Sequence, residues 1–158
     1  MYIPIQYVVG DATQPQGEGN KVILHCCNDE GKWGAGFSGA VSKRWPEPER
    51  VYRDCFAKHY WDRLGEIQIV NVAPDIVVIN AIMQHGIQQP GDMRTPFQYS
   101  SCIQALEKVA DFCRWNKVTV HCPKFGSGLA KGDWTMIATY VTEILSYREI
   151  PVIVYTLE

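Results

Sequence analysis

Two glycine-rich stretches carry the residue types that suit the binding of an anion. The first is NDEGKWGAGFSGA at residues 28–40, and the second is PKFGSGLA at residues 123–130. Glycine lets backbone N–H groups come close to an oxyanion, and the start of a helix adds free N–H groups and a positive dipole end. A side chain at Gly36 or Gly126 is therefore expected to fill the space that the anion needs, without unfolding the protein. Two such stretches in one chain predict a ligand with more than one phosphate.

Predicted strands and helices flank both stretches. Residues 21–27 and 117–122 are short apolar runs typical of buried strands. Apolar residues follow at helical spacing over 36–44 and 134–147, and Asp133 has the position of a helix N-cap. In a parallel sheet, ligands bind beyond the carboxyl ends of the strands. We therefore expect residues 10–11, 28–39, 125–130 and 155–156, which all fall at the carboxyl ends of predicted strands, to line one crevice.

Strands alternate with helices along the chain, which predicts one layered α/β domain over residues 1–158 with helices on both faces of the sheet. The runs at 21–27, 117–122 and 151–157 are almost continuously apolar, as parallel strands buried on both faces are. Further strands are expected at 2–9, 65–72 and 76–83, the last two as a hairpin, and further helices at 46–58 and 98–115.

The composition is that of an ordinary globular protein, with 158 residues, 20% of them charged, and a formal net charge of −2. This charge gives no long-range attraction to nucleic acid or to an anionic membrane, so neither is an expected partner. No apolar run approaches the ~20 residues that cross a bilayer, and the first residues lack the basic and apolar regions of a signal peptide. Most of the six cysteines lie within apolar patterns, which suits free thiols in a reducing compartment. We therefore expect a cytoplasmic protein.

One alternative comes from GAGFSG, residues 34–39, which matches the dinucleotide pattern GxGxxG. In that pattern the first glycine turns directly off the strand, whereas residues 28–33 intervene here. The acid expected roughly 20 residues later, at the end of a second strand, is also missing. An NAD-dependent oxidoreductase is therefore the weakest alternative. The second stretch lacks the Gly-Lys-Ser/Thr ending of an ATP-binding loop. A single glycine-rich loop could be a turn without a ligand, but two at matching strand ends favour a binding site.

A metal site is a further alternative, because His25-Cys26 and His121-Cys122 both fall at the ends of predicted strands. Neither the CxxC nor the HExxH spacing of common zinc sites is present. Adjacent residues of a strand point to opposite faces, so each pair can offer at most one ligand to a shared site. We expect no metal site and no cofactor.

Two polar residues at other strand ends have a structural and a functional interpretation. Asp11, after Gly10, could form a local Asx turn, or its carboxylate could accept a hydrogen bond from an exocyclic amine such as that of adenine. Tyr155 could belong to the core or its rim, or it could stack on a base. The residues alone leave both interpretations open.

Four motifs occur in a fixed order: GDAT at 10–13, HCCNDEGKWGAGFSGAV at 25–41, PKFGSGLAKGDW at 123–134 and VYTL at 154–157. Together they resemble a macrodomain, the ADP-ribose-binding module, from about residue 6 to the carboxyl end. The resemblance implies a three-layer α/β/α sandwich around a mixed, mostly parallel sheet. It also implies ADP-ribose or a derivative as the ligand, and an ADP-ribosylated protein as a candidate partner.

The resemblance assigns parts of the ligand to individual residues. Asp11 would bind the adenine amino group, with Ala12 beside it and Tyr155 against the ring. The first loop would wrap the distal ribose and a phosphate, and the second loop would cradle the diphosphate. The residues implied as ligand-binding are Asp11, Ala12, Asn28, Trp33, Gly34, Ala35, Gly36, Phe37, Phe125, Gly126, Ser127, Gly128, Leu129, Ala130 and Tyr155.

The chain departs from two hydrolase branches of this family. Ser38 stands where the branch with a GGGVD loop has an acid. Ala130 stands where the branch that acts through a lysine and an aspartate has its aspartate, and residues 77–83 contain no lysine. HCCN…GKWGAG is instead most similar to the yeast-type ADP-ribose 1''-phosphate phosphatases of Appr-1''-p processing, and bacterial and phage macrodomain proteins share it.

Two functional classes therefore remain open. One is a hydrolase of ADP-ribose 1''-phosphate or of an ADP-ribosyl linkage, and the other is a non-catalytic reader of ADP-ribosylated partners. Hydrolysis needs a base within hydrogen-bond reach of a water at the distal ribose. His25, Asn28 and Asp29 are the candidate catalytic residues, since histidine is the natural base near neutral pH. Lys32, on the same loop, could offset phosphate charge.

Overall fold

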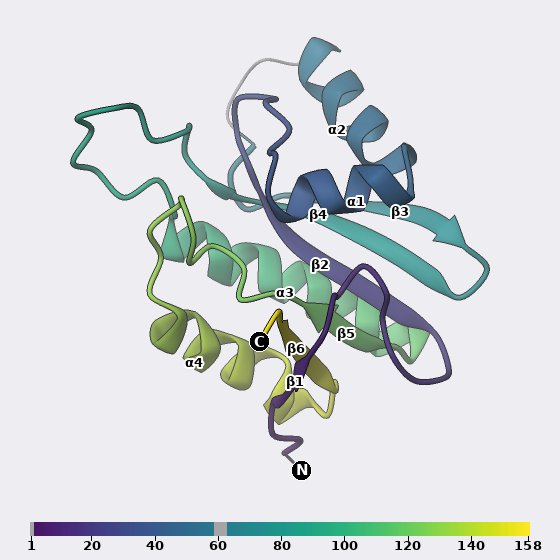
Figure 1. Cartoon of the computed structure of the whole chain (residues 1–158). Coiled ribbons are helices and arrows are strands. Elements are labelled where there is room, and N and C mark those ends of the chain that lie inside the picture. Colours follow the sequence, from purple (N-terminus) through teal and green to yellow (C-terminus); the bar gives the residue numbers. More distant parts are fainter. Residues whose placement is uncertain (1, 59–62) are drawn as a thin grey trace.

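The computed structural model describes residues 2–58 and 63–158 of the chain (Figure 1). Over these residues it contains one sheet of six strands and four α-helices. In chain order the elements are β1 (Gln6–Val9), β2 (Lys21–Asn28), α1 (Phe37–Arg44), α2 (Glu47–Lys58), β3 (Ile67–Ala73), β4 (Ile76–Gln84), α3 (Tyr99–Asn116), β5 (Thr119–Cys122), α4 (Trp134–Ile144), the 3-10 helix η1 (Ser146–Arg148) and β6 (Val152–Thr156).

The strands lie in the order β1-β6-β5-β2-β4-β3, with β2 near the middle. Strand β2 is buried almost throughout, which explains its apolar run. It pairs parallel with β4, which places His25 beside Asn80, and parallel with β5, which places Ile23 beside His121. Strands β3 and β4 form the predicted antiparallel hairpin. The described strands thus make the mixed, mostly parallel sheet that was expected.

Helices cover both faces of the sheet, because successive residues of each strand point to opposite sides. Helices α3 and α4 pack on one face, against core residues such as Leu24. Helices α1 and α2 cover the other face, where Val41 packs with Ile23 and Val78. Figure 1 shows the two helix pairs on opposite sides of the sheet. The architecture is therefore a three-layer α/β/α sandwich.

Strands β1 and β5 and helix α4 are shorter than the sequence predicted. Lys117 has a left-handed backbone with φ of 48°, which ends α3 and delays the start of β5 to residue 119. Helix α4 ends at residue 144, because residues 146–148 form a separate 3-10 turn and Glu149, with φ of 62°, redirects the chain toward β6. Strand β1 begins only at residue 6, since the chain before it runs beside η1 and the Ile3 N–H donates to a carbonyl there.

None of the helices in the described part of the chain combines the length and the apolar character needed to span a membrane. All six cysteines are free thiols.

Candidate functional site

A cavity of about 460 Å³ opens at the carboxyl ends of β2 and β5, between the two glycine-rich loops. The sequence predicted a crevice between these two loops, but residues 10–11 and 155–156, which were expected to share it, do not line this cavity. The expected site residues that line it are His25, Asn28, Trp33, Gly34, Ala35, Gly36, Phe37, Phe125, Gly126, Gly128, Leu129 and Ala130. The expected site residues that lie outside its lining are Asp11, Ala12, Asp29, Ser127 and Tyr155.

The charged side chains at the cavity are cations. Lys32 and Lys124 line it, and no Asp or Glu of the described residues does. Lys32 Nζ lies 3.1 Å from Glu30 Oε1, but both side chains are exposed, so this ion pair contributes only about 0–1 kcal/mol. Lys32 can therefore turn toward a ligand. The cavity favours an anion, although the whole chain carries a net charge of −2.

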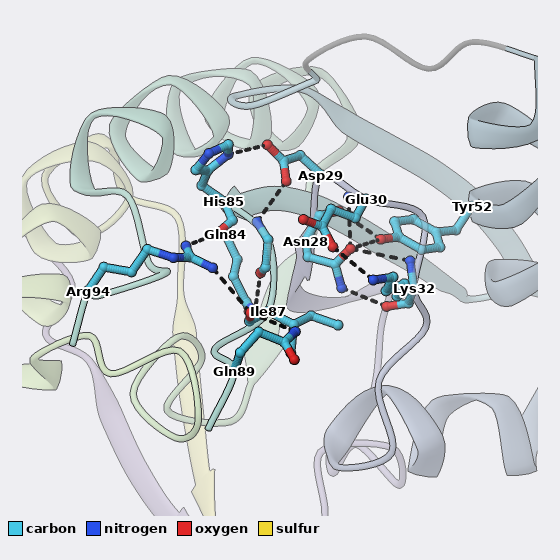
Figure 2. A network of polar contacts seen from close by, with 11 residues as sticks. Asn28, Asp29, Glu30, Lys32, Tyr52, Gln84, His85, Ile87, Gln89 and Arg94 are labelled. Carbon is cyan, nitrogen blue, oxygen red and sulfur yellow. Dashed lines mark hydrogen bonds and ion pairs between the residues drawn. The ribbon is translucent and has the colours of Figure 1, made fainter. Parts of the chain in front are cut away.

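Asn28, at the end of β2, holds the first loop in shape (Figure 2). Its Oδ1 accepts hydrogen bonds from the N–H groups of Glu30 at 2.9 Å and Lys32 at 3.3 Å, and its Nδ2 donates to the Lys32 carbonyl at 2.6 Å. The Tyr52 hydroxyl of α2 lies 2.7 Å from the Asn28 carbonyl oxygen and 2.8 Å from Oδ1. Burial raises the pKa of Tyr52 far above its ordinary value, so the hydroxyl keeps its proton. An amide carries two N–H donors, and Asn28 uses one of them in the bond to the Lys32 carbonyl.

His25 lies in the floor of the cavity and is 1% exposed. Its Nδ1 lies 3.0 Å from Ser38 Oγ, and its Nε2 lies 2.6 Å from Asn80 Oδ1. Burial lowers the pKa of His25 to about 4, so the imidazole is neutral near neutral pH. Both ring nitrogens therefore have protein partners. His25 would have to give up one of these bonds before it could take a proton from a water molecule.

Asp29 does not join His25 and Asn28 in one cluster, although the sequence placed the three together. Its Oδ2 lies 2.7 Å from His85 Nδ1, and its Oδ1 accepts a hydrogen bond from the Gly86 N–H at 2.8 Å. Figure 2 shows the Asp29 carboxylate turned toward the loop that follows β4. Asp29 thus anchors this loop, whose residue Ile87 lines the cavity.

The glycines of the two loops differ in whether a side chain would fit at their positions. Gly126 has φ of +76°, and a Cβ added there would lie 2.3 Å from the Phe97 ring. The expectation that a side chain at Gly126 would only fill the crevice is therefore wrong, because it would strain the backbone and overlap Phe97. Gly36 and Gly128 line the cavity, and a Cβ on either meets nothing within 4 Å. A side chain at Gly36 or Gly128 can therefore fill the cavity without a clash in the fold, as was expected of Gly126.

The residues expected near adenine form a separate polar cluster at the ends of β1 and β6. Asp11 Oδ1 accepts hydrogen bonds from the Thr13 N–H at 2.9 Å and from the Thr13 hydroxyl at 2.8 Å, which makes a local Asx turn. The Tyr155 hydroxyl accepts a hydrogen bond from the Gln16 N–H at 2.8 Å and lies 2.8 Å from His121 Nδ1. Asp11 therefore forms the local turn of the structural interpretation, and both of these hydrogen bonds fall on Oδ1, not on Oδ2.

Residues from α2, from β4 and from the loop after β4 contribute to the site without having been expected there. Tyr52 and Ile87 line the cavity, and Asn80 forms a hydrogen bond with the ring of His25. Asn80 did leave a signal, because it is a polar residue inside the apolar run VVINAIM. The contributions of Tyr52 and Ile87 depend on how a helix and a loop pack, which the local sequence does not encode.

Within residues 2–58 and 63–158, no three His, Cys, Asp or Glu side chains are grouped so that they could hold a metal ion. Cys26 lines the cavity, and burial raises the pKa of its thiol to about 12. The thiol is therefore protonated and not a reactive thiolate.

Solved structures resemble the chain over almost its whole length. A macrodomain protein from Streptomyces coelicolor is 42% identical with a TM-score of 0.82, over 96% of this chain and 98% of that one. A protein of unknown function from Bacteroides thetaiotaomicron is 43% identical with a TM-score of 0.92, over 97% and 98% of the two chains. DarTG of Thermosipho africanus, solved in complex with ADP-ribose, is 16% identical with a TM-score of 0.75, over 96% of this chain and 41% of that one, and shares the fold.

Curated proteins are more distant. Mouse chromodomain-helicase-DNA-binding protein 1-like is 27% identical over 161 residues, and the match covers 96% of this chain but 17% of the mouse protein. The ADP-ribose 1''-phosphate phosphatase of Candida albicans is 28% identical over 136 residues, which is 82% of this chain and 86% of the phosphatase. No protein-family model matches the sequence. The family is decided by the 42% identity to the Streptomyces protein over nearly the full length of both chains. The chain belongs to the macrodomain family.

Proposed function

We propose that this macrodomain binds ADP-ribose, or a derivative of it, in the cavity between the two glycine-rich loops. The observation that carries the proposal is the composition of the cavity wall. Backbone of two glycine-rich loops and two lysines face the space, and no carboxylate of the described residues does. A diphosphate is the kind of group that such a wall stabilises. The volume of about 460 Å³ lies within the usual 300–1,000 Å³ of small-ligand sites.

The geometry supports a division of the ligand along the edge of the sheet. The distal ribose would lie at Asn28 and the loop before α1, and the diphosphate would lie along residues 125–130. The adenine would extend toward Asp11, Ala12 and Tyr155, which follow β1 and end β6 at the same edge. The Oδ2 of Asp11 would accept the exocyclic amine. The relatives named for ADP-ribose and for its 1''-phosphate support this choice of ligand.

Calorimetry with ADP-ribose tests the proposal. We expect a dissociation constant in the micromolar range, equivalent to roughly −8 kcal/mol. ADP, which keeps the adenine and the diphosphate, should bind more weakly, and ribose 5-phosphate more weakly still. The absence of binding heat with millimolar ADP-ribose would exclude this function.

Hydrolysis of ADP-ribose 1''-phosphate is a second candidate, favoured by the similarity to the Candida albicans phosphatase. The acid–base groups of His25 and Asp29 are bonded to protein partners. His25 would have to give up one of its bonds to accept a proton, whereas the carboxylate of Asp29 keeps further acceptor sites. Release of inorganic phosphate by the native chain and by His25→Ala measures this, and a background rate in the native chain leaves a binding module that reads free or protein-linked ADP-ribose.

A further inference from the structure

A buried chain of hydrogen bonds runs from α2 through β4 and β2 to the cavity, and its first link fixes the direction of the others. Asn80 is fully buried, and its Nδ2 donates to the Pro48 carbonyl and to Gln68 Oε1, both at 3.0 Å. A backbone carbonyl can only accept a hydrogen bond. The amide nitrogen of Asn80 must therefore face Pro48, which leaves Oδ1 facing His25.

The second link determines the tautomer of His25. Asn80 Oδ1 lies 2.6 Å from His25 Nε2 and can only accept, so Nε2 carries the proton. Burial holds the pKa of His25 at about 4, so the ring is neutral and has one N–H. Nδ1 is then an acceptor. The aromatic rings of Trp33 and Phe37 pack against the imidazole and keep it in this orientation.

The third link reaches the cavity. Ser38 Oγ lies 3.0 Å from His25 Nδ1, and it must donate its only proton there. The Trp33 Nε1–H donates to the Ser38 carbonyl at 3.0 Å, which fixes the backbone of this residue. Ser38 lines the cavity with 9% of its surface exposed, and it packs beside Gly34, where an added Cβ would lie 3.8 Å from Ser38 Oγ.

We propose that Ser38 is a specificity-determining residue that offers the cavity a hydrogen-bond acceptor and no donor. It therefore selects a ligand hydroxyl at this point and disfavours an anionic oxygen. The inference rests on the proposed function for the identity of the group, a hydroxyl of the distal ribose. Phosphate oxygens, which are acceptors, belong at the backbone N–H groups and at Lys32 and Lys124. The hydrogen bond from Ser38 to His25 would make Ser38 a nucleophile only if His25 took the proton of the Ser38 hydroxyl. A buried imidazole whose charged form is disfavoured is a weak base for that proton.

The direction of the chain can be measured without a ligand. In the ¹⁵N NMR spectrum of the native protein, the His25 ring should show a protonated Nε2 and an unprotonated Nδ1. A proton on Nδ1 would reverse the bond to Ser38 and overturn the inference.

The specificity can be measured by calorimetry with ADP-ribose and with ADP, which lacks the distal ribose. Ser38→Ala should weaken ADP-ribose binding about 3–10-fold, the effect of one neutral hydrogen bond, and change ADP binding less than about twofold. Ser42→Ala is the matched control, because Ser42 lies on the same helix, donates to the Gly39 carbonyl and does not line the cavity. It should change neither affinity.

Equal losses for both ligands, or no loss for ADP-ribose, would overturn the role of Ser38. Failure of the native chain to bind ADP-ribose would instead overturn the proposed function, and with it the identity of the hydroxyl. The NMR spectrum still decides the direction of the hydrogen bond in that case.

Discussion

Two glycines of the second loop should respond in opposite ways to the same substitution. Gly126 and Gly128 both line the cavity and are separated by one residue. We expect Gly128→Val to block ADP-ribose binding while the protein stays folded. We expect Gly126→Val to destabilise the fold, because Gly126 has φ of +76° and packs against Phe97.

The magnitude for Gly126→Val follows from two contributions. A residue with a Cβ loses about 1–2 kcal/mol in the left-handed region. The overlap with the Phe97 ring, 2.3 Å from the first added carbon, adds about 1–3 kcal/mol of overpacking. Together they give about 2–5 kcal/mol, a large part of the 5–15 kcal/mol that stabilises a typical domain. For a chain of this size the melting temperature should fall by about 4–20 °C.

Thermal unfolding of the two variants and calorimetry with ADP-ribose check this prediction. Gly128→Val should melt within a few degrees of the native protein and show no binding heat at concentrations that saturate the native chain. Equal melting temperatures for the two variants would refute the role assigned to Gly126 and Phe97. Full affinity in Gly128→Val would refute the placement of the ligand between the loops.

Three further predictions concern other parts of the site. Folding lowers the pKa of His25 from 6.5 to about 4, so the unfolded chain binds a proton more readily than the folded one between these values. The free energy of unfolding should therefore be highest above about pH 6.5 and fall by about 3 kcal/mol as the pH drops toward 4. Urea unfolding and NMR titration of the ring measure this, and a ring that titrates near 6.5 would contradict it. Asp11→Ala should weaken ADP-ribose binding at least tenfold, because it removes a charge-assisted hydrogen bond worth about 1.5–3 kcal/mol, and it should leave the binding of ribose 5-phosphate almost unchanged. An equal loss of affinity for both ligands would show that Asp11 only shapes its turn. Tyr52→Phe removes the hydroxyl that contacts Asn28, so the free energy of unfolding should fall by about 1–3 kcal/mol and ADP-ribose binding should weaken. An unchanged affinity for ADP-ribose would show that the first glycine-rich loop keeps its shape without this hydroxyl.

The sequence predicted those features of the fold and site that depend on neighbouring residues. The apolar run of β2 and the glycines after it are local signals, and the rule for parallel sheets then placed both loops at one edge. The partnership of His25 and Asn80 depends on the register between β2 and β4, which no local pattern specifies. Glycine composition also did not distinguish Gly126 from Gly128, because the sign of φ depends on the path of the loop past Phe97.

The position of β6 between β1 and β5 has a consequence for synthesis of the chain on the ribosome. The described neighbour of β1 in the sheet is β6, and Gln6 pairs with Ile153, so this contact closes a loop of nearly the whole chain. Both glycine-rich loops leave the ribosome before β6 does, and the pairing of β1 with β6 can form only afterwards. A nascent chain that stops before residue 152 leaves the edges of β1 and β5 unpaired, and such edges are templates for aggregation. The side of the site proposed for adenine is therefore completed after the side proposed for the diphosphate, once β6 has left the ribosome.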